Sequence, residues 1–249
     1  MEIRFDNKIV VVTGGSSGIG LAAVSAFEEA GAIVYNLDIA KPASGSSHFL
    51  KCNIADFDNV NTHLSTIIAK HGQIHHAFLN AGVHQVGNVE DLSLDEIDKV
   101  ININIKGVIY CLKCILPNMR IHQEGSIVLM GSDQSFVGKG DSFIYGATKG
   151  AIGQLTKSTA IDYAPYNIRI NCVCPGTIET PLYHGAVANF SERKGMDKDD
   201  VYEIIKTAQP IPRVGLPEEV ANTVLFLCSD KTGFTTGALL SIDGGYVAQ

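Results

Sequence analysis

The sequence predicts an α/β protein in which a parallel sheet of about seven strands carries helices on both faces, the doubly wound arrangement. Two observations predict it. Short runs rich in Val and Ile alternate with longer amphipathic segments along the chain, and this alternation is typical of parallel strands joined by helical crossovers. In addition, the first such run leads directly into a glycine-rich turn and a helical pattern, a junction common in these sheets.

Seven segments have the length and residue types of strands, and five have helical periodicity. The expected strands are Lys8–Thr13, Ile33–Asp38, His48–Cys52, Ile74–Leu79, Ser126–Met130, Arg169–Cys174 and Ala238–Ile242. The expected helices are Gly18–Ala30, Phe57–His71, Ser93–Met119, Tyr145–Tyr163 and Pro217–Ser229. In such a sheet, a ligand is expected beyond the carboxyl ends of the strands.

A chain of 249 residues without a low-complexity tract is expected to form one domain, residues 1–249. The stretch from Pro181 to Pro212 interrupts the alternation of strands and helices. An insert of this length beside the binding edge predicts either a substrate lid or ordinary surface helices, and we favour the lid.

Composition excludes several classes of protein. A hydrophobic share of 45% with 18% charged residues is typical of a folded globular protein. The net charge of -7 disfavours a nucleic-acid partner. No segment has the pattern of a signal peptide or a membrane span, so we expect a cytoplasmic protein without a membrane partner.

The cysteines and histidines do not predict a metal site. Six cysteines lie scattered in apolar segments and are expected to be thiols. Cys111 and Cys114 form a CxxC without a second pair and are interpreted as core residues. His75 and His76 are neighbours in a predicted strand, so their side chains should point to opposite faces.

The first expected strand ends in a turn that suits a phosphate group. Glycines let a backbone turn sharply and approach a pyrophosphate, whose charge is met by the N–H groups that open the next helix. The sequence lacks the Gly-Lys-Ser/Thr of a P-loop. The expected cofactor contacts in this turn are Gly14, Ser16, Ser17, Gly18, Ile19 and Gly20.

Asp38 ends the second expected strand, about twenty residues beyond the turn, where a carboxylate can accept hydrogen bonds from the adenosine ribose. The same carboxylate would repel a 2′-phosphate. NAD is therefore favoured over NADP, although Lys41 lies close enough in the sequence to leave NADP open.

Tyr145 and Lys149 are four residues apart and should share one face of a helix. A neighbouring ammonium can lower the pKa of a tyrosine, which then suits proton transfer to or from an alcohol oxygen. The same spacing recurs at Tyr202 and Lys206 inside the insert, so spacing alone proves little. Ser132, at the end of the fifth expected strand, distinguishes Tyr145 because its hydroxyl could bond a substrate oxygen.

In order along the whole chain, TGGSSGIG, Asn80-Ala81-Gly82, Asn104, Ser132, the YxxxK at Tyr145 and Pro175-Gly176 resemble the short-chain dehydrogenase/reductase family, which has the Rossmann fold. The resemblance implies that Tyr145 is the acid/base and that Lys149 lowers its pKa and bonds the nicotinamide ribose. It implies that Ser132 orients the substrate oxygen and that Asn104 holds a water in a proton relay.

The resemblance also implies further cofactor contacts: Asn80, Ala81 and Gly82 beside the adenosine, and Pro175, Gly176, Ile178 and Thr180 around the nicotinamide carboxamide. Two positions depart from the family pattern. Asn53, next to Ile54, replaces an Asp that bonds adenine, and its carbonyl could still accept that bond. Leu79 replaces a common Asn at a position expected to be the buried end of a strand.

These residues predict an NAD(H)-dependent oxidoreductase that interconverts a secondary alcohol and its ketone. The alternative is a protein that senses a dinucleotide without turnover. Sugars, diols, hydroxy acids and small cyclic alcohols all stay open as substrates. Their expected contacts are Ser132, Gln134, Tyr145 and Tyr183, with Phe136, Phe143 and His184 nearby. The helix from Tyr145 has few charges, and with the family resemblance this predicts a homotetramer.

Overall fold

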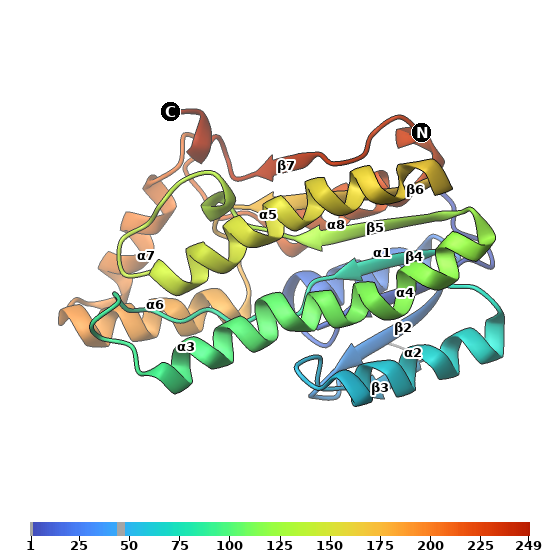
Figure 1. Ribbon diagram of the computed structural model, residues 1–249. Coiled ribbons are helices and arrows are strands. Elements are labelled where there is room, and N and C mark those ends of the chain that lie inside the picture. Colours follow the sequence, from blue (N-terminus) through green and yellow to red (C-terminus); the bar gives the residue numbers. More distant parts are fainter. Residues whose placement is uncertain (1, 44–47) are drawn as a thin grey trace.

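A computed structural model describes residues 2–43 and 48–249, which form a sheet between two layers of helices (Figure 1). All neighbouring strands pair in parallel, in the order β3-β2-β1-β4-β5-β6-β7. Their bounds are β1 Ile9–Thr13, β2 Ile33–Asp38, β3 His48–Lys51, β4 His76–Leu79, β5 Gly125–Met130, β6 Ile168–Pro175 and β7 Leu239–Ile242. The predicted doubly wound sheet is confirmed, with strand ends shifted by at most two residues.

Two helices cover one face of the sheet and three cover the other. The longer helices are α1 Gly18–Glu29, α2 Phe57–His71, α3 Leu94–Ile101, α4 Val108–His122, α5 Phe143–Tyr163, α6 Pro181–Lys194, α7 Lys198–Thr207 and α8 Pro217–Cys228. Helices α1 and α8 pack on the face that Val10 and Val12 enter, whereas α2, α4 and α5 pack on the face that Val11 enters. This alternation within β1 is the period-two pattern of a strand buried on both faces.

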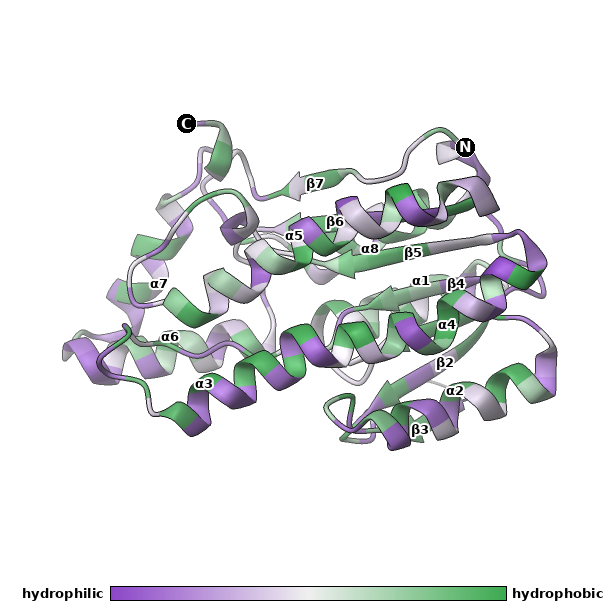
Figure 2. Cartoon of the chain, viewed as in Figure 1, coloured by the Kyte–Doolittle hydropathy of each residue, from purple (hydrophilic) through white to green (hydrophobic). Residues whose placement is uncertain are grey.

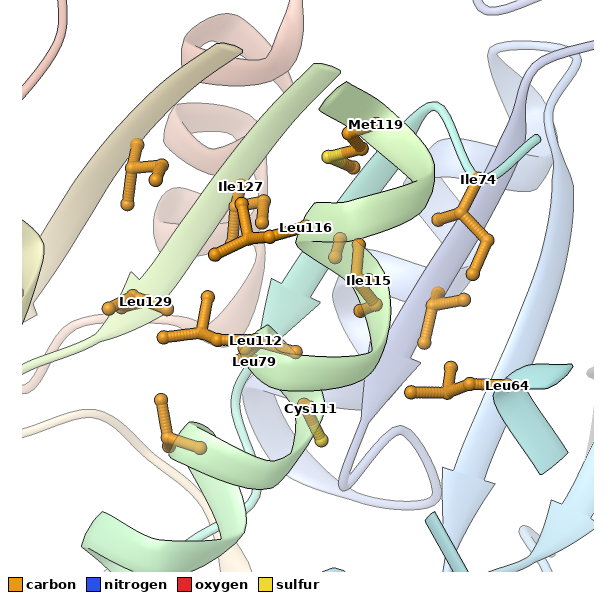
Figure 3. Close-up of a cluster of buried hydrophobic side chains, with 14 of the residues drawn as sticks. Leu64, Ile74, Leu79, Cys111, Leu112, Ile115, Leu116, Met119, Ile127 and Leu129 are labelled. Carbon is orange, nitrogen blue, oxygen red and sulfur yellow. The ribbon is translucent and has the colours of Figure 1, made fainter. Parts of the chain in front are cut away.

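Helix α4 shows how an amphipathic segment is fixed to the sheet. Cys111, Leu112, Ile115 and Met119 recur at helical spacing and belong to the buried cluster between α4 and the strands, which the close-up draws together with Leu116 and Ile127 (Figure 3). In the hydropathy view, apolar and polar bands alternate along this helix (Figure 2). Burying each large aliphatic side chain contributes roughly 1.5–3 kcal/mol before the cost in entropy.

The expected helix Ser93–Met119 is one continuous helical stretch with a π-helical segment, η1 Asn102–Gly107, between α3 and α4. The sequence was expected to contain no segment that resembles a membrane span. By length and composition, that expectation is wrong. Leu94–His122 has 29 helical residues and is apolar enough to cross a membrane. In the fold, however, the α4 part of this stretch packs on the sheet and the α3 part packs against α5, which explains the apolar residues on those faces.

The insert at 181–212 folds into α6 and α7, at the end of the molecule that the strands point toward (Figure 1). Its attachment to the rest of the chain is polar. Arg193 donates to the main-chain oxygen of Val86 over 2.6 Å and pairs with Asp91 over 2.7 Å. Lys194 pairs with Asp141 over 2.9 Å. These contacts hold the end of α6 over the carboxyl ends of the strands, and a hydrogen bond from the Ile211 N–H to the Gly244 oxygen over 3.0 Å ties the other end of the insert.

Candidate active site

A cavity of about 650 Å³ lies at the carboxyl ends of the strands, beside the point between β1 and β4 where the strand order reverses. Nineteen of the residues predicted for the site line it: Gly14, Ser17, Gly18, Ile19, Asp38, Asn53, Ile54, Asn80, Ala81, Gly82, Ser132, Gln134, Tyr145, Lys149, Pro175, Gly176, Ile178, Thr180 and Tyr183. Ser16, Gly20 and Asn104 are not among the lining residues.

Steric limits explain the glycines of the turn after β1. Gly14 has a φ of +66°, and a Cβ there would lie 2.8 Å from the Cα of Ala81. A Cβ on Gly20 would collide with the main-chain oxygen of Gly14. Helix α1 begins at Gly18, and its N-cap Ser17 makes no side-chain capping bond. The first N–H groups of α1 are therefore available to an anion in the cavity.

Asp38 joins this turn to the end of β2. Its Oδ2 accepts a hydrogen bond from the Ser16 N–H over 3.0 Å, and its Oδ1 accepts one from the Ala40 N–H over 3.1 Å. The Ser16 hydroxyl donates to the main-chain oxygen of Ala40 over 2.6 Å. Ser16, predicted as a cofactor contact, thus fixes the turn against β2 from outside the cavity wall. Lys41 is exposed and does not line the cavity.

Asn80 fastens the turn from the other side. Its Nδ2 donates to the main-chain oxygens of Thr13 and Gly14 over 3.2 and 3.0 Å. Leu79 ends β4 and is 1% exposed, as the sequence predicted for this departure from the family pattern. The other departure, Asn53, is exposed, and its Oδ1 accepts a hydrogen bond from the Ala55 N–H.

Ser132 and Tyr145 come from different elements to the same wall of the cavity. Ser132 follows Gly131 just beyond the end of β5, and Tyr145 lies in the first turn of α5. Burial raises the pKa of Tyr145, a hydrogen bond with Ser132 acts in the opposite direction, and the Asp133 and Cys174 side chains raise the pKa further. The phenol is therefore a proton donor throughout the neutral pH range.

Lys149 is 4% exposed and lies on the same side of α5 as Tyr145, with its Nζ 5.5 Å from the centre of the phenol ring. The ammonium donates to the main-chain oxygen of Met130 over 2.7 Å. Burial lowers the pKa of Lys149 to about 8. Burial raises the pKa of Tyr145 more than the hydrogen bond with Ser132 lowers it, and the expectation that Lys149 lowers the pKa of this phenol stays a prediction.

Asn104 lies behind the cavity, inside the π-helical segment. Its Oδ1 accepts from the Val83 N–H over 2.9 Å, and its Nδ2 donates to the Val83 oxygen over 2.9 Å and to the Thr148 hydroxyl over 3.1 Å. The carboxamide therefore holds the loop after β4 against α5. Any water held by Asn104 would have to bind its main-chain oxygen, because the side chain is already engaged.

The second YxxxK pair has none of these surroundings. The Tyr202 hydroxyl bonds His184 over 3.0 Å, and Lys206 pairs with Glu203 on the exposed side of α7. Neither Tyr202 nor Lys206 lines the cavity. Helical spacing alone is therefore explained here by a surface helix, as the sequence comparison of the two pairs suggested.

Comparison with known proteins adds independent information about this site. The family model described as "Enoyl-(Acyl carrier protein) reductase" matches residues 14–247. The meso-2,3-butanediol dehydrogenase of Serratia marcescens is 34% identical over 256 residues, which are 99% of this chain and 97% of that protein. The chain belongs to the short-chain dehydrogenase/reductase family. The resemblance inferred from the motifs is confirmed, and the protein is an oxidoreductase of this family.

Other members extend the comparison. The cis-4-hydroxycyclohexanecarboxylate dehydrogenase of Sinomonas cyclohexanicum is 34% identical over 100% of both chains. The ligand-free aldohexose dehydrogenase of Thermoplasma acidophilum superimposes with a TM-score of 0.92 at 34% identity, covering 98% of this chain and 95% of that one. The structure of ElxO with NADP bound superimposes with a TM-score of 0.88 at 30% identity, covering 98% of this chain and 100% of that one. The family binds nicotinamide dinucleotides, and these members leave NAD and NADP unresolved.

The substrate end of the cavity differs from the sequence expectation. Gln134 and Tyr183 line it as predicted, but Phe136, Phe143 and His184 do not. The insert contributes a mainly apolar wall, formed by Leu182, Ala186, Val187, Phe190, Val201, Ile204 and Ile205. The sequence did not predict this wall. Polar and apolar residues are interspersed in α6, so its sequence has no clear apolar stripe.

Three polar residues near Tyr145 were also missed. The His84 ring lies 4.6 Å from the Tyr145 ring, measured between centres, and burial lowers the pKa of His84 to about 4. Asp133 and Lys139 form an ion pair of 2.6 Å at the cavity wall. Asp133 follows Ser132 directly, and this adjacency was the one available signal in the sequence.

The residues once considered as metal ligands lie in the core. Cys111 is buried and Cys114 half-buried, and both are free thiols. His75 accepts a hydrogen bond from the Ile9 N–H over 3.0 Å, whereas His76 is 8% exposed within β4. Within residues 2–43 and 48–249, no group of three or more His, Cys, Asp or Glu side chains is placed to hold a metal ion.

Proposed function

We propose that this chain is an NAD(H)-dependent oxidoreductase that interconverts a secondary alcohol and its ketone, with Tyr145 as the acid and base. One observation carries the proposal. Tyr145, Lys149 and Ser132 line the same cavity as the glycine turn and Asp38. A proton-transfer group and a dinucleotide cradle in one cavity suit the paired transfer of a proton and a hydride.

The residues of the cavity fit a dinucleotide. The N–H groups at the start of α1 would hold the pyrophosphate, and Asp38 would accept hydrogen bonds from the adenosine ribose. Asn53, Ile54 and Asn80–Gly82 would lie beside the adenosine, and Pro175, Gly176, Ile178 and Thr180 around the carboxamide. Among the described lining residues, the basic side chains are Lys139 and Lys149, both near Tyr145. A 2′-phosphate at Asp38 would thus meet a carboxylate without a cation from the wall, which supports NAD.

In ketone reduction, Tyr145 donates its phenolic proton to the substrate oxygen while Ser132 hydrogen-bonds the same oxygen. In alcohol oxidation, the Tyr145 phenolate accepts that proton, and the Lys149 ammonium stabilises the phenolate. The bound nicotinamide supplies or accepts the hydride. Fixing the oxygen between two hydroxyl groups of the wall contributes to the rate through orientation.

The apolar wall of the insert narrows the substrate class that the sequence left open. A sugar would place several hydroxyl groups against Val187, Phe190 and Ile205 and leave them without partners, which is unfavourable in a buried site. A compact alcohol with an apolar ring or chain would bury that part against the same wall. The relative from Sinomonas is named for a substrate with a cyclohexane ring, which agrees with a cyclic secondary alcohol.

We also propose a cellular location, an oligomeric state and a role for the insert. We place the protein in the cytoplasm, supported by free thiols at all six cysteines. We propose a homotetramer built partly through α4 and α5, supported by the exposure of Ile109 and Ile161 on these helices. The insert is proposed as a lid because exposed ion pairs of Arg193 and Lys194 and the hydrogen bond of Arg193 to Val86 hold the end of α6, and exposed pairs contribute little to stability.

Tyr145→Phe tests the proposed chemistry. The variant keeps the ring and loses the proton, so turnover of cyclohexanol with NAD should fall by at least about 100-fold while NADH still binds. Tyr202→Phe is the matched control because Tyr202 has the same spacing to a lysine outside the cavity. Absorbance of NADH measures turnover, and most of the activity surviving in Tyr145→Phe would exclude the assignment.

Asp38→Asn tests the cofactor. Removing the charge while keeping the shape should bring the affinities for NADPH and NADH closer together by about tenfold, or roughly 1.4 kcal/mol. Fluorescence titration with both dinucleotides measures the ratio. If the wild-type protein already binds NADPH more tightly than NADH, the preference for NAD is wrong.

A further inference from the structure

The Ser132 hydroxyl contacts an ion pair between a buried carboxylate and a half-buried ammonium. Asp133 is 2% exposed, and its Oδ1 accepts the Ser132 hydroxyl proton over 2.8 Å. Its Oδ2 accepts from the Lys139 ammonium over 2.6 Å. The Lys139 Nζ lies 4.4 Å from the centre of the Tyr246 ring, near the end of the chain. Each Asp133 oxygen thus has a charged or hydroxyl partner, and the chemistry proposed above uses Ser132 but gives no role to Asp133 or Lys139.

A carboxylate at this depth is costly without compensation, since a buried charge that loses its partner destabilises a protein strongly. An apolar residue after Ser132 would avoid that cost altogether. We propose that Asp133 and Lys139 act together as positioning residues, which direct the Ser132 hydroxyl and set the charge around Tyr145, and thereby fix the pH range of alcohol oxidation. This inference rests on the proposed function, because it assigns these residues to the same proton transfer.

The Ser132 hydroxyl can donate its proton in only one direction at a time. The Ser132 hydroxyl has a single hydrogen, which Asp133 accepts, and its oxygen accepts from the Gln134 N–H over 3.2 Å. Donation from Ser132 to a substrate oxygen therefore requires the hydroxyl to turn away from Asp133. Lys139 draws charge from the carboxylate and so weakens the competition for that hydrogen.

Asp133 and Lys139 also change the charge around Tyr145. The charged and titratable groups that face Tyr145 are His84 from the loop after β4, Asp133 after β5, Cys174 at the end of β6 and Lys149 on α5. With a pKa of about 4, His84 is neutral at the working pH. The Asp133 carboxylate raises the pKa of Tyr145, and Lys139 opposes the Asp133 charge at short range. Removing one member of the pair should therefore have the opposite effect to removing the other.

The experiment compares Asp133→Asn, Lys139→Met and the double variant. With Asp133→Asn, the pH at which alcohol oxidation becomes half-maximal should fall by on the order of 1 unit, because the phenolate forms more easily. With Lys139→Met it should rise by a similar amount, and in the double variant it should return toward the wild type. Cyclohexanol is the substrate because a neutral alcohol cannot gain or lose an ion pair with Lys139.

Two controls separate charge from folding. Lys139→Arg keeps the charge and should preserve the wild-type pH profile. Asp230→Asn makes the same chemical change in the exposed ion pair of Asp230 with Lys231. Neither residue lines the cavity, so this variant should leave the pH profile unchanged. The kcat and KM values are compared separately, because a merely structural role would lower activity equally at every pH.

A second readout does not depend on turnover. The ultraviolet difference between each variant and its Tyr145→Phe counterpart follows ionisation of this phenol alone, and the midpoint should shift in the same two directions. Equal shifts for Asp133→Asn and Lys139→Met, or losses of rate without any shift, would overturn the inference. If Asp133→Asn does not fold, Lys139→Met decides alone. An upward shift of its pH midpoint would support the inference, and an unchanged midpoint would overturn it. Activity retained in Tyr145→Phe would instead contradict the proposed function, so the two failures are distinguishable.

Discussion

Replacing Gly14 with Ala tests whether the turn after β1 is a cofactor cradle. The φ of +66° costs a residue with a side chain about 1 kcal/mol. The new Cβ would also lie 2.8 Å from the Cα of Ala81, a backbone atom that cannot rotate away. Overpacking of this kind costs about 1–3 kcal/mol. We expect Gly14→Ala to lower the free energy of unfolding by about 2–4 kcal/mol.

Gly72→Ala supplies the matched control. Gly72 follows α2 with a φ of +81°, and a Cβ there would have no atom within 4 Å. This variant therefore carries the backbone strain alone and should lose about 1 kcal/mol, or roughly 2–4 °C in melting temperature. Thermal denaturation followed by circular dichroism measures both losses, and their difference reports the crowding against Ala81.

The two variants should differ more in cofactor binding than in stability. In Gly14→Ala the turn must move away from Ala81, so the N–H groups at the start of α1 move with it. A loss of 1.4 kcal/mol in binding corresponds to a tenfold weaker Kd for NADH, and we expect at least about that much. Gly72→Ala should bind NADH like the wild type. A folded Gly14→Ala protein with unchanged NADH affinity would refute the cradle.

Two further predictions concern pH and the insert. Because burial raises the pKa of Tyr145, the protonated phenol that reduction needs persists through neutral pH. Oxidation needs the phenolate, so its initial rate should keep rising as the pH is raised above neutral, and an oxidation rate that falls with rising pH would contradict the sign. Arg193→Met removes the bonds to Val86 and Asp91, so KM for the alcohol should rise about threefold to tenfold with little change in the Kd of NADH. Arg4→Met, which breaks the distant exposed pair with Asp6, is its control, and equal KM values would show that Arg193 does not hold the insert.

The fold and the cofactor end of the cavity could be predicted from the sequence because both depend on local patterns. Short Val and Ile runs bounded by turn residues favour strands, and Gly14 and Asp38 lie at the ends of β1 and β2. Asp133 and His84 could not be predicted in the same way. Their contacts with Ser132 and Tyr145 form only when the segments after β4 and β5 pack against α5. The sequence of a single segment does not predict such a contact.

The insert illustrates a related limit. Its position in the chain predicted a segment near the substrate, but Phe143 and His184 were expected at the cavity and do not line it, whereas Val187 and Phe190 do. A helix exposes different residues to a neighbour according to its rotation about its own axis. That rotation is set by contacts such as the bond of Arg193 to Val86, which join residues far apart in the sequence.

The YxxxK spacing shows why proximity to a cation did not settle the chemistry of Tyr145. Spacing reveals the attraction between ammonium and phenolate but not the cost of burying either charge. That burial raises the pKa of Tyr145 and lowers that of Lys149 to about 8, so each group alone is driven toward its neutral form. If both groups are charged, each attracts the other, so we expect a change at Lys149 to move the pH at which Tyr145 ionises. A pH profile should thus report the pair, and Lys149→Met should shift it to higher pH because the phenolate would then form without its partner.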